Sequence, residues 1–404
     1  VYVVVGQKRE SINDRVAKIL TLRSSFDKMI LVSVGNGHVN DENIMIKPFP
    51  NPFGILRLMG LQKLKKNLDK YFFFPSRNIL YVKAVQKKLK KNILNDLKKG
   101  KKVSLLTCLP PHDLALIGLF IKRQFPETYW IVDWQDLWSY DENYFQRVPQ
   151  LYRERLLRLE KEVLDNCDMN VTTNLSAKEV LEKRYDAPSW SVVSINHHFY
   201  REDLLESTVE VDHFSEDKKN RIVRIGFLGT LFKPPRVPGA KVLKAIDCVI
   251  DSGINIELHV YGGASEDARK SLKRLRNEGV CLHGKTSHIE SLRRIARCEF
   301  LFLVLADLPN CRAVMSIKLP HYLLLERPVL AIVPERSAVT DVIRETGSGY
   351  VIPAGCDWGH GLKKVLQDYL NGKNLPERNN KAIEAYSWEN ISKQWMEVFS
   401  GAWK

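Results

Sequence analysis

The sequence predicts an α/β protein of two domains, each built on a doubly wound parallel sheet, and three observations support this prediction. A chain of 404 residues is too long for one ordinary hydrophobic core, so two domains of roughly 200 residues are expected. Short β-branched runs alternate with helical stretches, which is the pattern of strand–helix–strand units. This alternation stops in the polar stretch 201–221 and then begins again.

Residues 1–200 are expected to form the first Rossmann-like domain. Strands are predicted for the apolar runs 2–5, 29–34, 103–107, 130–132, 169–172 and 191–195. Amphipathic helices are predicted between them, at 12–22, 81–97, 115–124, 151–166 and 177–184. Ligands bind at the carboxyl ends of the strands in open sheets of this kind, so site residues are expected there.

Residues 222–385 are expected to form the second Rossmann-like domain, after a linker at 201–221. Strands are predicted at 222–228, 256–261, 280–283, 300–305, 328–333 and 350–352. Helices are predicted at 239–252, 264–278, 289–296, 337–346 and 358–370. The last segment, 386–404, carries Trp388, Ile391 and Trp395 at helical spacing and is predicted to contain a final helix.

The composition, with 44% hydrophobic and 27% charged residues, is that of a soluble globular protein. The sequence has no run of about 18 apolar residues, so no transmembrane helix is expected, and its start does not read as a signal peptide. The seven cysteines are scattered without a CxxC pair. This spacing favours reduced thiols that pack in a cytoplasmic protein, and no metal site is expected.

The net charge of +15 is concentrated in one segment, 56–102. It holds fifteen Lys and Arg residues against two acids, Asp69 and Asp96. Over 56–74 the charges alternate with apolar and aromatic residues, which favours contact with an anionic membrane surface. Over 83–99 a solvated helix face explains the charge equally well. No nucleic-acid recognition motif accompanies it, so nucleic acid is not the expected partner.

The stretch 314–333 is the most informative in the chain. Ser316 and Lys318 open a helix with an apolar stripe, and the run 328–333 has the length and branching of a buried strand. The free N–H groups at the start of a helix attract phosphate, and a lysine there adds a full charge. A site for an anion is therefore predicted at this point.

This stretch resembles the donor-binding signature of glycosyltransferase family 4, whose members have the GT-B fold. The matching residues are Lys318, Tyr322, Leu323, Pro328 and Val329. The resemblance covers nearly the whole chain and implies two Rossmann-like domains, with the last helix crossing back to pack on the first domain. It also implies that the second domain binds the diphosphate of a nucleotide-sugar.

One departure from the family pattern concerns a pair of glutamates spaced Glu-x7-Glu, the second of which contacts the donor ribose. The two positions hold Ala313 and His321 in this chain, so both carboxylates are missing. His321 has hydrogen-bonding groups for a ribose. The alternatives are altered donor binding or a loss of activity.

A glycine-rich turn and two cations precede this stretch. Gly229 and Thr230 end a strand, and Lys233 and Arg236 follow in the loop. Glycine lets the backbone approach a ligand closely, and two cations suit the two phosphates of a nucleotide-sugar. The family resemblance places the same loop at the donor diphosphate.

Two further strand ends match family segments that lie near the donor. Gly262 belongs to the first match, and His283, Gly284 and Lys285 belong to the second. The resemblance implies a place near the nucleotide base for these residues. For Lys285, a solvated loop charge is the alternative interpretation.

In the first domain, a Pro-Pro loop, a helix and a second strand lead to Asp133 and Asp136. The family has an Asp-x-Arg-Asp-x-Trp stretch here, and Gln135 replaces its arginine. Either the two aspartates lie at the cleft between the domains, near the acceptor hydroxyl as catalytic groups or ordering the loops of the cleft, or they cap backbone N–H groups of the loop. His112 is a further catalytic candidate, with a surface position as the alternative.

These observations predict a glycosyltransferase that moves a sugar from a nucleotide-sugar to a lipid-linked or cell-surface glycan. The family resemblance implies retention of anomeric configuration, and no metal motif is suitably placed, so no cofactor is expected beyond the nucleotide-sugar substrate. The expected location is the cytoplasm, at the inner face of the cell membrane. A non-catalytic scaffold at the membrane and a GT-B sugar epimerase are the alternatives.

Overall fold

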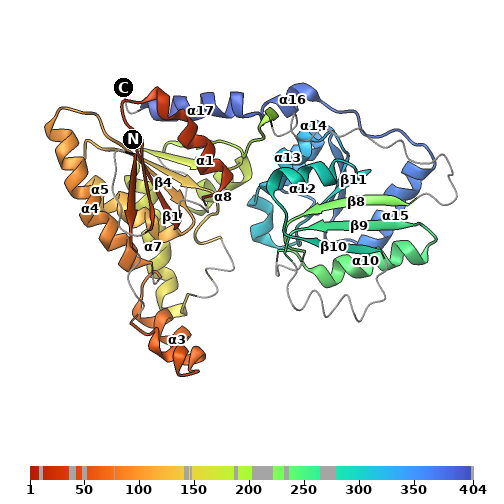
Figure 1. Cartoon of the computed structure of the whole chain (residues 1–404), viewed down its shortest axis with the longest axis horizontal. Helices are drawn as coiled ribbons and strands as arrows, with labels where there is room; N and C mark the ends of the chain where they lie inside the picture. Colours follow the sequence, from red (N-terminus) through yellow and green to blue (C-terminus); the bar gives the residue numbers. More distant parts are fainter. Residues whose placement is uncertain are drawn as a thin grey trace. The chain divides into compact units, whose positions relative to one another are not determined.

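The chain folds into two compact units in the computed structural model (Figure 1). Unit 1 comprises residues 1–196 and 392–404, and unit 2 comprises residues 197–391. Most of the expected linker 201–221 and the expected helix 264–278 lie outside the described residues. The structure describes residues 1–8, 12–35, 42–47, 52–76, 78–140, 145, 148–185, 190–202, 222–231, 236–263 and 279–401.

Unit 1 is built on a parallel seven-stranded sheet in the order β3-β2-β1-β4-β5-β6-β7. Six strands lie where the hydrophobic runs predict them, and β3 was not predicted because its four residues, NIMI, are too short for a clear alternation. The strands are β1 (Tyr2–Lys8), β2 (Ile30–Val34), β3 (Asn43–Ile46), β4 (Ser104–Leu109), β5 (Tyr129–Trp134), β6 (Met169–Thr172) and β7 (Val192–Ser194).

The helices of unit 1 include two, α2 (Ile55–Leu58) and α3 (Gln62–Phe72), whose described side chains are all partly or fully exposed. The long α4 (Ile79–Lys98) lies against α5 (Ala115–Gln124) and buries an apolar stripe that includes Val82, Val85 and Leu89. The other helices given bounds in the described part of unit 1 are α1 (Asp14–Thr21), α7 (Gln150–Asn166) and α8 (Leu175–Arg184), with 3-10 turns η2 (Leu22–Ser25) and η3 (His112–Leu114).

The C-terminal helix α17 (Trp388–Ser400) returns the chain to unit 1, as predicted. Trp395 and Phe399 on this helix are fully buried. The Phe399 ring meets that of Phe26 edge-on, with the centroids 5.2 Å apart. Burial of two large aromatic side chains in this way supplies several kcal/mol, about 1.5–3 kcal/mol for each, and fixes the helix on the first unit.

Unit 2 has a parallel six-stranded sheet in the order β10-β9-β8-β11-β12-β13, which is the Rossmann strand order. Helices α10 (Gly239–Asp251) and α15 (Trp358–Leu370) cover one face, and α12 (His288–Ile295), α13 (Lys318–Leu324) and α14 (Ala338–Thr346) cover the other (Figure 1). The strands are β8 (Val223–Leu228), β9 (Ile256–Tyr261), β10 (Val280–Gly284), β11 (Phe300–Val304), β12 (Val329–Val333) and β13 (Gly349–Pro353), followed by α16 (Asn380–Glu384).

Both sheets are parallel throughout, so the carboxyl ends of the strands in each unit share one edge. The predicted site residues follow β4, β5, β8, β9, β10 and β11 and therefore gather at these two edges. Among the helices that the structure describes, none combines the length and the apolar character needed to cross a bilayer.

Candidate functional site

Three strand ends of unit 2 meet at two glycines. The N–H of Gly229, after β8, donates to the carbonyl of Tyr261 at 2.8 Å, and the N–H of Gly262, after β9, donates to the carbonyl of Gly284 at 2.7 Å. Gly229 and Gly262 have positive φ angles of 98° and 153°. A Cβ added to Gly262 would lie 2.3 Å from the carbonyl oxygen of Gly229. The two backbones therefore approach so closely that only glycine fits at position 262.

The side chain of Lys318, the first residue of α13, lies beside this glycine pair. Its Nζ is 3.2 Å from the point that a Cβ on Gly229 would occupy, and 4.0 Å from the centroid of the Phe227 ring. The glycine therefore leaves room for the ammonium at the end of β8. Because α13 has only seven residues, the charge of Lys318, and not the helix dipole, is the feature here that suits an anion.

Tyr322 holds α13, and with it Lys318, in place. Its hydroxyl accepts a hydrogen bond from the N–H of Leu228 at 3.1 Å and donates to the carbonyl of Phe302 at 3.2 Å, so it joins the helix to both β8 and β11. Burial of this hydroxyl raises the pKa of Tyr322, so it stays a donor at any ordinary pH. The sequence shows Tyr322 as part of an apolar stripe, and this positioning role is not evident from it. Ser316 lies half-buried just before the helix.

Replacing Gly262 by alanine is expected to weaken binding of a nucleoside diphosphate. The new methyl group must displace Gly229 and the adjoining Lys318, besides the cost of the positive φ, which is about 1–2 kcal/mol for a residue with a Cβ. Gly253→Ala is the matched control, because Gly253 also has a positive φ, 83°, but an added Cβ meets no atom within 4 Å. Calorimetry with UDP that gave equal affinities for the two variants would contradict this account of the glycine pair.

The loop after β8 contributes two further predicted residues within the described range. Thr230 lies beside Gly263, with its Oγ1 3.2 Å from the point that a Cβ there would occupy. The carbonyl of Arg236 accepts from the N–H of Ala306 at 2.8 Å, which fixes the loop at the end of β11. Both residues are therefore at the same sheet edge as Lys318. Lys233 lies outside the described residues.

Three aromatic side chains from β9 and β10 have their rings stacked near the carboxyl ends of these two strands. The ring of His283 lies 4.4 Å from that of Tyr261 and 5.2 Å from that of His259, each within 7° of parallel. Nε2 of His283 is 2.9 Å from Nδ1 of His259. Desolvation, followed by the charges of His259 and Arg294, lowers the pKa of His283. A neutral, flat ring surface therefore stands next to Gly284, where the sequence predicts the base of the nucleotide.

His321 and Ala313 occupy the two positions of the missing glutamates. His321 is only 4% exposed, and its ring meets that of His288 edge-on, with the centroids 4.5 Å apart. Ala313 is buried at the end of η4 (Pro309–Ala313). Neither position brings a carboxylate to this edge, and the predicted contact between His321 and a ribose stays a prediction.

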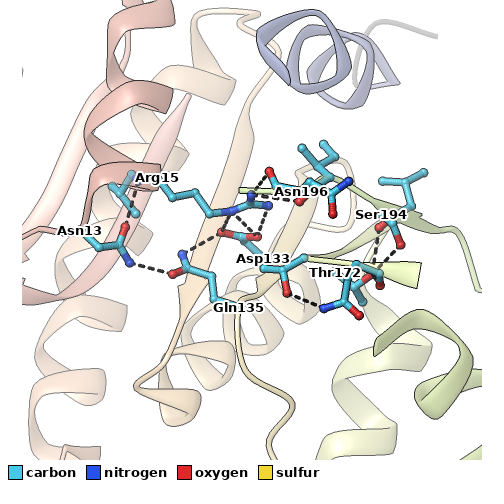
Figure 2. A network of polar contacts seen from close by, with 12 residues as sticks. Asn13, Arg15, Asp133, Gln135, Thr172, Ser194 and Asn196 are labelled. Atoms are coloured by element: carbon cyan, nitrogen blue, oxygen red, sulfur yellow. Dashed lines mark hydrogen bonds and ion pairs between the residues drawn. The ribbon is translucent and has the colours of Figure 1, made fainter. Parts of the chain in front are cut away.

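In unit 1, Asp133 forms a buried ion pair with Arg15 (Figure 2). Both side chains are at most 1% exposed. Arg15 donates from Nε to both carboxylate oxygens, at 3.2 and 3.0 Å, and from Nη2 to Oδ1 at 2.9 Å. The side-chain amide of Gln135 donates to Oδ2 at 2.9 Å. Both oxygens therefore have partners inside the protein, which favours a role in ordering the loop over the catalytic role predicted for Asp133.

Arg15 also holds the two segments through which the chain passes between the units. Its Nη1 donates to the carbonyl of Ile195 at 3.0 Å and to that of Asn196 at 2.9 Å, the last residues of unit 1 before unit 2 begins (Figure 2). Its guanidinium carbon lies 5.0 Å from the ring centroid of Trp395 on the returning helix α17. A single cation thus binds one segment by hydrogen bonds and the other by a cation–π contact.

His112 and Asp136, the other two predicted catalytic residues, lie next to each other at the carboxyl ends of β4 and β5. Nε2 of His112 donates to the carbonyl of Asp136 at 2.9 Å, and the imidazole stacks on Trp138 with the ring centroids 5.8 Å apart. His112 is 2% exposed, so it is not the surface residue of the alternative interpretation. Asp136 is half-buried. Their roles in catalysis stay predictions.

The adjacent Asp113 was not singled out from the sequence. It is buried, and Oδ2 accepts a hydrogen bond from the Ser76 hydroxyl at 2.5 Å. Desolvation raises the pKa of Asp113, although the bonds from Ser76 and Asn78 oppose that shift. This contact joins the segment just before α4 to η3, which leads into α5.

No protein family and no curated protein sequence matches this chain, but its fold is shared with many solved structures. Sucrose-phosphate synthase from Thermosynechococcus elongatus has a TM-score of 0.66 at 11% identity, over 100% of this chain and 98% of that one. A glycosyltransferase from Rickettsia africae has a TM-score of 0.64 at 12% identity, over 100% and 98%. A UDP-forming trehalose-phosphate synthase from Burkholderia vietnamiensis has a TM-score of 0.65 at 8% identity, over 99% of each chain.

At these identities the likeness concerns the fold. Over nearly its whole length, the chain has the fold of proteins whose names identify them as a glycosyltransferase, a sucrose-phosphate synthase and a trehalose-phosphate synthase. The chain therefore has the two-domain GT-B fold.

Proposed function

We propose that this chain is a glycosyltransferase that takes its sugar from a nucleotide-sugar bound in unit 2. The observation that carries the proposal is the position of Lys318, whose ammonium lies against Gly229 at the end of β8. A cation beside a glycine suits a diphosphate, because no side chain at the glycine keeps phosphate oxygens away from the ammonium. Solved proteins of the same fold include one bound with UDP-2-fluoro glucose.

The proposed reaction needs positive charge where the nucleoside diphosphate leaves. Negative charge grows on the leaving phosphate as the sugar becomes an oxocarbenium-like species, and fixed cations stabilise that charge in the transition state. Lys318 supplies this charge, together with Arg236 or Lys233 from the loop after β8. The stacked rings of Tyr261 and His283 border the base. The family-4 resemblance supports a retaining, metal-independent reaction.

The acceptor is proposed to be a lipid-linked or cell-surface glycan, reached at the inner face of the cell membrane. The basic segment 56–102, with fifteen cations and two acids, supports a location at an anionic surface. Asp136 and His112, at the carboxyl ends of the unit 1 strands, are the groups proposed to lie near the acceptor hydroxyl.

A panel of nucleotide-sugars tests the proposed activity. The protein should release the nucleoside diphosphate from one of them, slowly with water and faster with a lipid-linked acceptor. Absence of both release and binding across the panel would contradict a transferase.

One observation favours a second candidate, a non-catalytic GT-B partner protein. Both glutamates of the family pattern are missing, at Ala313 and His321. Calorimetry with nucleoside diphosphates and the release assay separate the two candidates together, because a transferase both binds a nucleoside diphosphate and releases it from the donor, whereas a scaffold does not turn the donor over. Binding without any turnover would favour the scaffold with a retained nucleotide site.

A further inference from the structure

The helical arm, residues 55–72 with α2 and α3, exposes an unusual amount of apolar surface. Of fourteen large hydrophobic side chains that are exposed in the described part of the chain, seven lie in these eighteen residues. Soluble proteins rarely leave such a patch uncovered unless it meets a partner. The seven are Ile55 (64%), Leu58 (87%), Met59 (64%), Leu61 (44%), Leu64 (46%), Tyr71 (54%) and Phe72 (69%).

The arm carries positive charge as well. Its sequence contains five cations against the single acid Asp69, and Asp69 is paired with Lys65. A second copy of the chain would bring the same positive charge to the contact and would be repelled. A bilayer with anionic headgroups matches both properties, since it attracts the cations and accepts the apolar side chains below the headgroup level.

The base of the arm is attached to the body of unit 1. The hydroxyl of Tyr152 donates to the carbonyl of Tyr71 at 3.1 Å, and its ring lies 5.3 Å from that of Phe74. The guanidinium of Arg155 stands 4.5 Å from the Phe74 ring centroid. Helix α7 therefore anchors the arm at one end, and α3 extends away from the sheet (Figure 1).

The neighbouring basic helix α4 differs from the arm. Its apolar side chains Val82, Val85, Leu89 and Ile93 are fully buried in unit 1, so its lysines form the solvated face of a core helix. The basic segment 56–102 thus divides into two parts. The arm exposes its apolar face, whereas the apolar face of α4 is buried in the core of unit 1.

We propose that the arm, and not α4, is the membrane-binding element, and that it inserts Leu58, Met59 and Phe72 into an anionic lipid surface. The proposal deepens the proposed function by assigning its membrane contact to one element. Lipid binding needs neither donor nor acceptor, so it can be tested without the transferase activity.

The contribution of the arm's positive charge to membrane binding is tested by co-sedimentation. The whole chain is mixed with phosphatidylcholine vesicles, with and without phosphatidylserine. Wild type should bind the vesicles that contain phosphatidylserine. The triple variant Arg57→Gln, Lys63→Gln and Lys66→Gln should lose about tenfold or more in affinity, because each surface cation contributes about 1 kcal/mol, or roughly fivefold. The matched control Lys83→Gln, Lys87→Gln and Lys91→Gln removes three exposed charges from α4 and should bind nearly as wild type.

The double variant Leu58→Ser with Phe72→Ser tests the contribution of the apolar side chains. Its affinity for the vesicles that contain phosphatidylserine should fall by about tenfold or more. Leu151→Ser with Leu175→Ser is the matched control, because these leucines are 78% and 67% exposed but lie outside the arm.

Equal losses in an arm variant and its control would overturn the proposal, as would failure of the wild type to bind either vesicle. Association of the wild type into dimers that the arm variants abolish would assign the arm to a protein contact instead. UDP calorimetry on the same variants reports the donor site separately.

Discussion

Replacing Lys318 by methionine is expected to weaken binding of UDP or another nucleoside diphosphate by about tenfold or more, since a charge-assisted hydrogen bond to phosphate contributes about 1.5–3 kcal/mol. Methionine preserves most of the side-chain volume and can keep the contact with Phe227, so the change isolates the charge. The fold should be unaffected, because the ammonium at the end of the side chain is not part of the core. Titration calorimetry measures the affinity directly.

The matched control is Lys364→Met on α15, which removes an exposed lysine from a helix that covers the opposite face of the same sheet. This variant should bind the nucleotide like the wild type. If Lys318→Met also bound like the wild type, the anion site would not lie at the end of β8. If both variants lost affinity by the same factor at low salt only, the effect would be that of the overall positive charge.

If the chain is an active transferase, Lys318→Met should lower turnover more than it raises the KM for the donor. The ammonium is proposed to stabilise charge that grows on the leaving phosphate, and such an interaction is stronger in the transition state than in the ground state. A change confined to KM would show that Lys318 binds the diphosphate without assisting its departure.

The fold and the donor edge could be predicted because their signals are local. The β-branched runs and the glycines stand next to one another in the sequence, and apolar runs predict twelve of the thirteen strands that the described part of the chain contains. The missing strand, at most four residues long, has too few positions for a pattern. Helices α2 and α3 appear in the sequence analysis only as a basic and apolar stretch, although α3 carries Leu64, Tyr71 and Phe72 at helical spacing.

The role of Arg15 could not be predicted in this way. It stands in an amphipathic helix, where an arginine is ordinarily solvent-exposed, and its partner Asp133 lies 118 residues further along the chain. One signal did exist. Gln135 stands where the family that the sequence resembles has an arginine beside the aspartates, so a buried Asp133 must obtain a cation from elsewhere. The identity of that cation depends on how α1 packs against β5. The hydrophobic periodicity of the sequence does not specify contacts between elements so far apart in the chain.

Replacing Arg15 alone by methionine is expected to lower the free energy of unfolding of unit 1 by about 3–5 kcal/mol, because Asp133 is then left charged in an enclosed site. Urea denaturation followed by tryptophan fluorescence measures this, since Trp134 and Trp395 are both buried in unit 1. Arg23→Met is the control. The Arg23 and Glu42 side chains are 34% and 57% exposed, and an exposed pair contributes about 0–1 kcal/mol.

The double variant Arg15→Met with Asp133→Leu separates the ion pair from the other contacts of Arg15. Apolar side chains of similar volume often replace a buried ion pair at little cost, so stability should return to within about 1–2 kcal/mol of the wild type. A double variant as unstable as the single one would mean that the uncompensated charge of Asp133 is not the cause.

Even with stability restored, the double variant lacks the hydrogen bonds to the carbonyls of Ile195 and Asn196 and the contact with Trp395. Amide hydrogen exchange should therefore be faster than in the wild type in two places, residues 192–196 and the part of α17 in unit 1, while the β4 and β5 amides exchange as before. Exchange unchanged in both places would mean that Arg15 serves only to neutralise Asp133. Faster exchange in both would establish that one buried cation fixes, within unit 1, the two segments through which the chain leaves for unit 2 and returns from it.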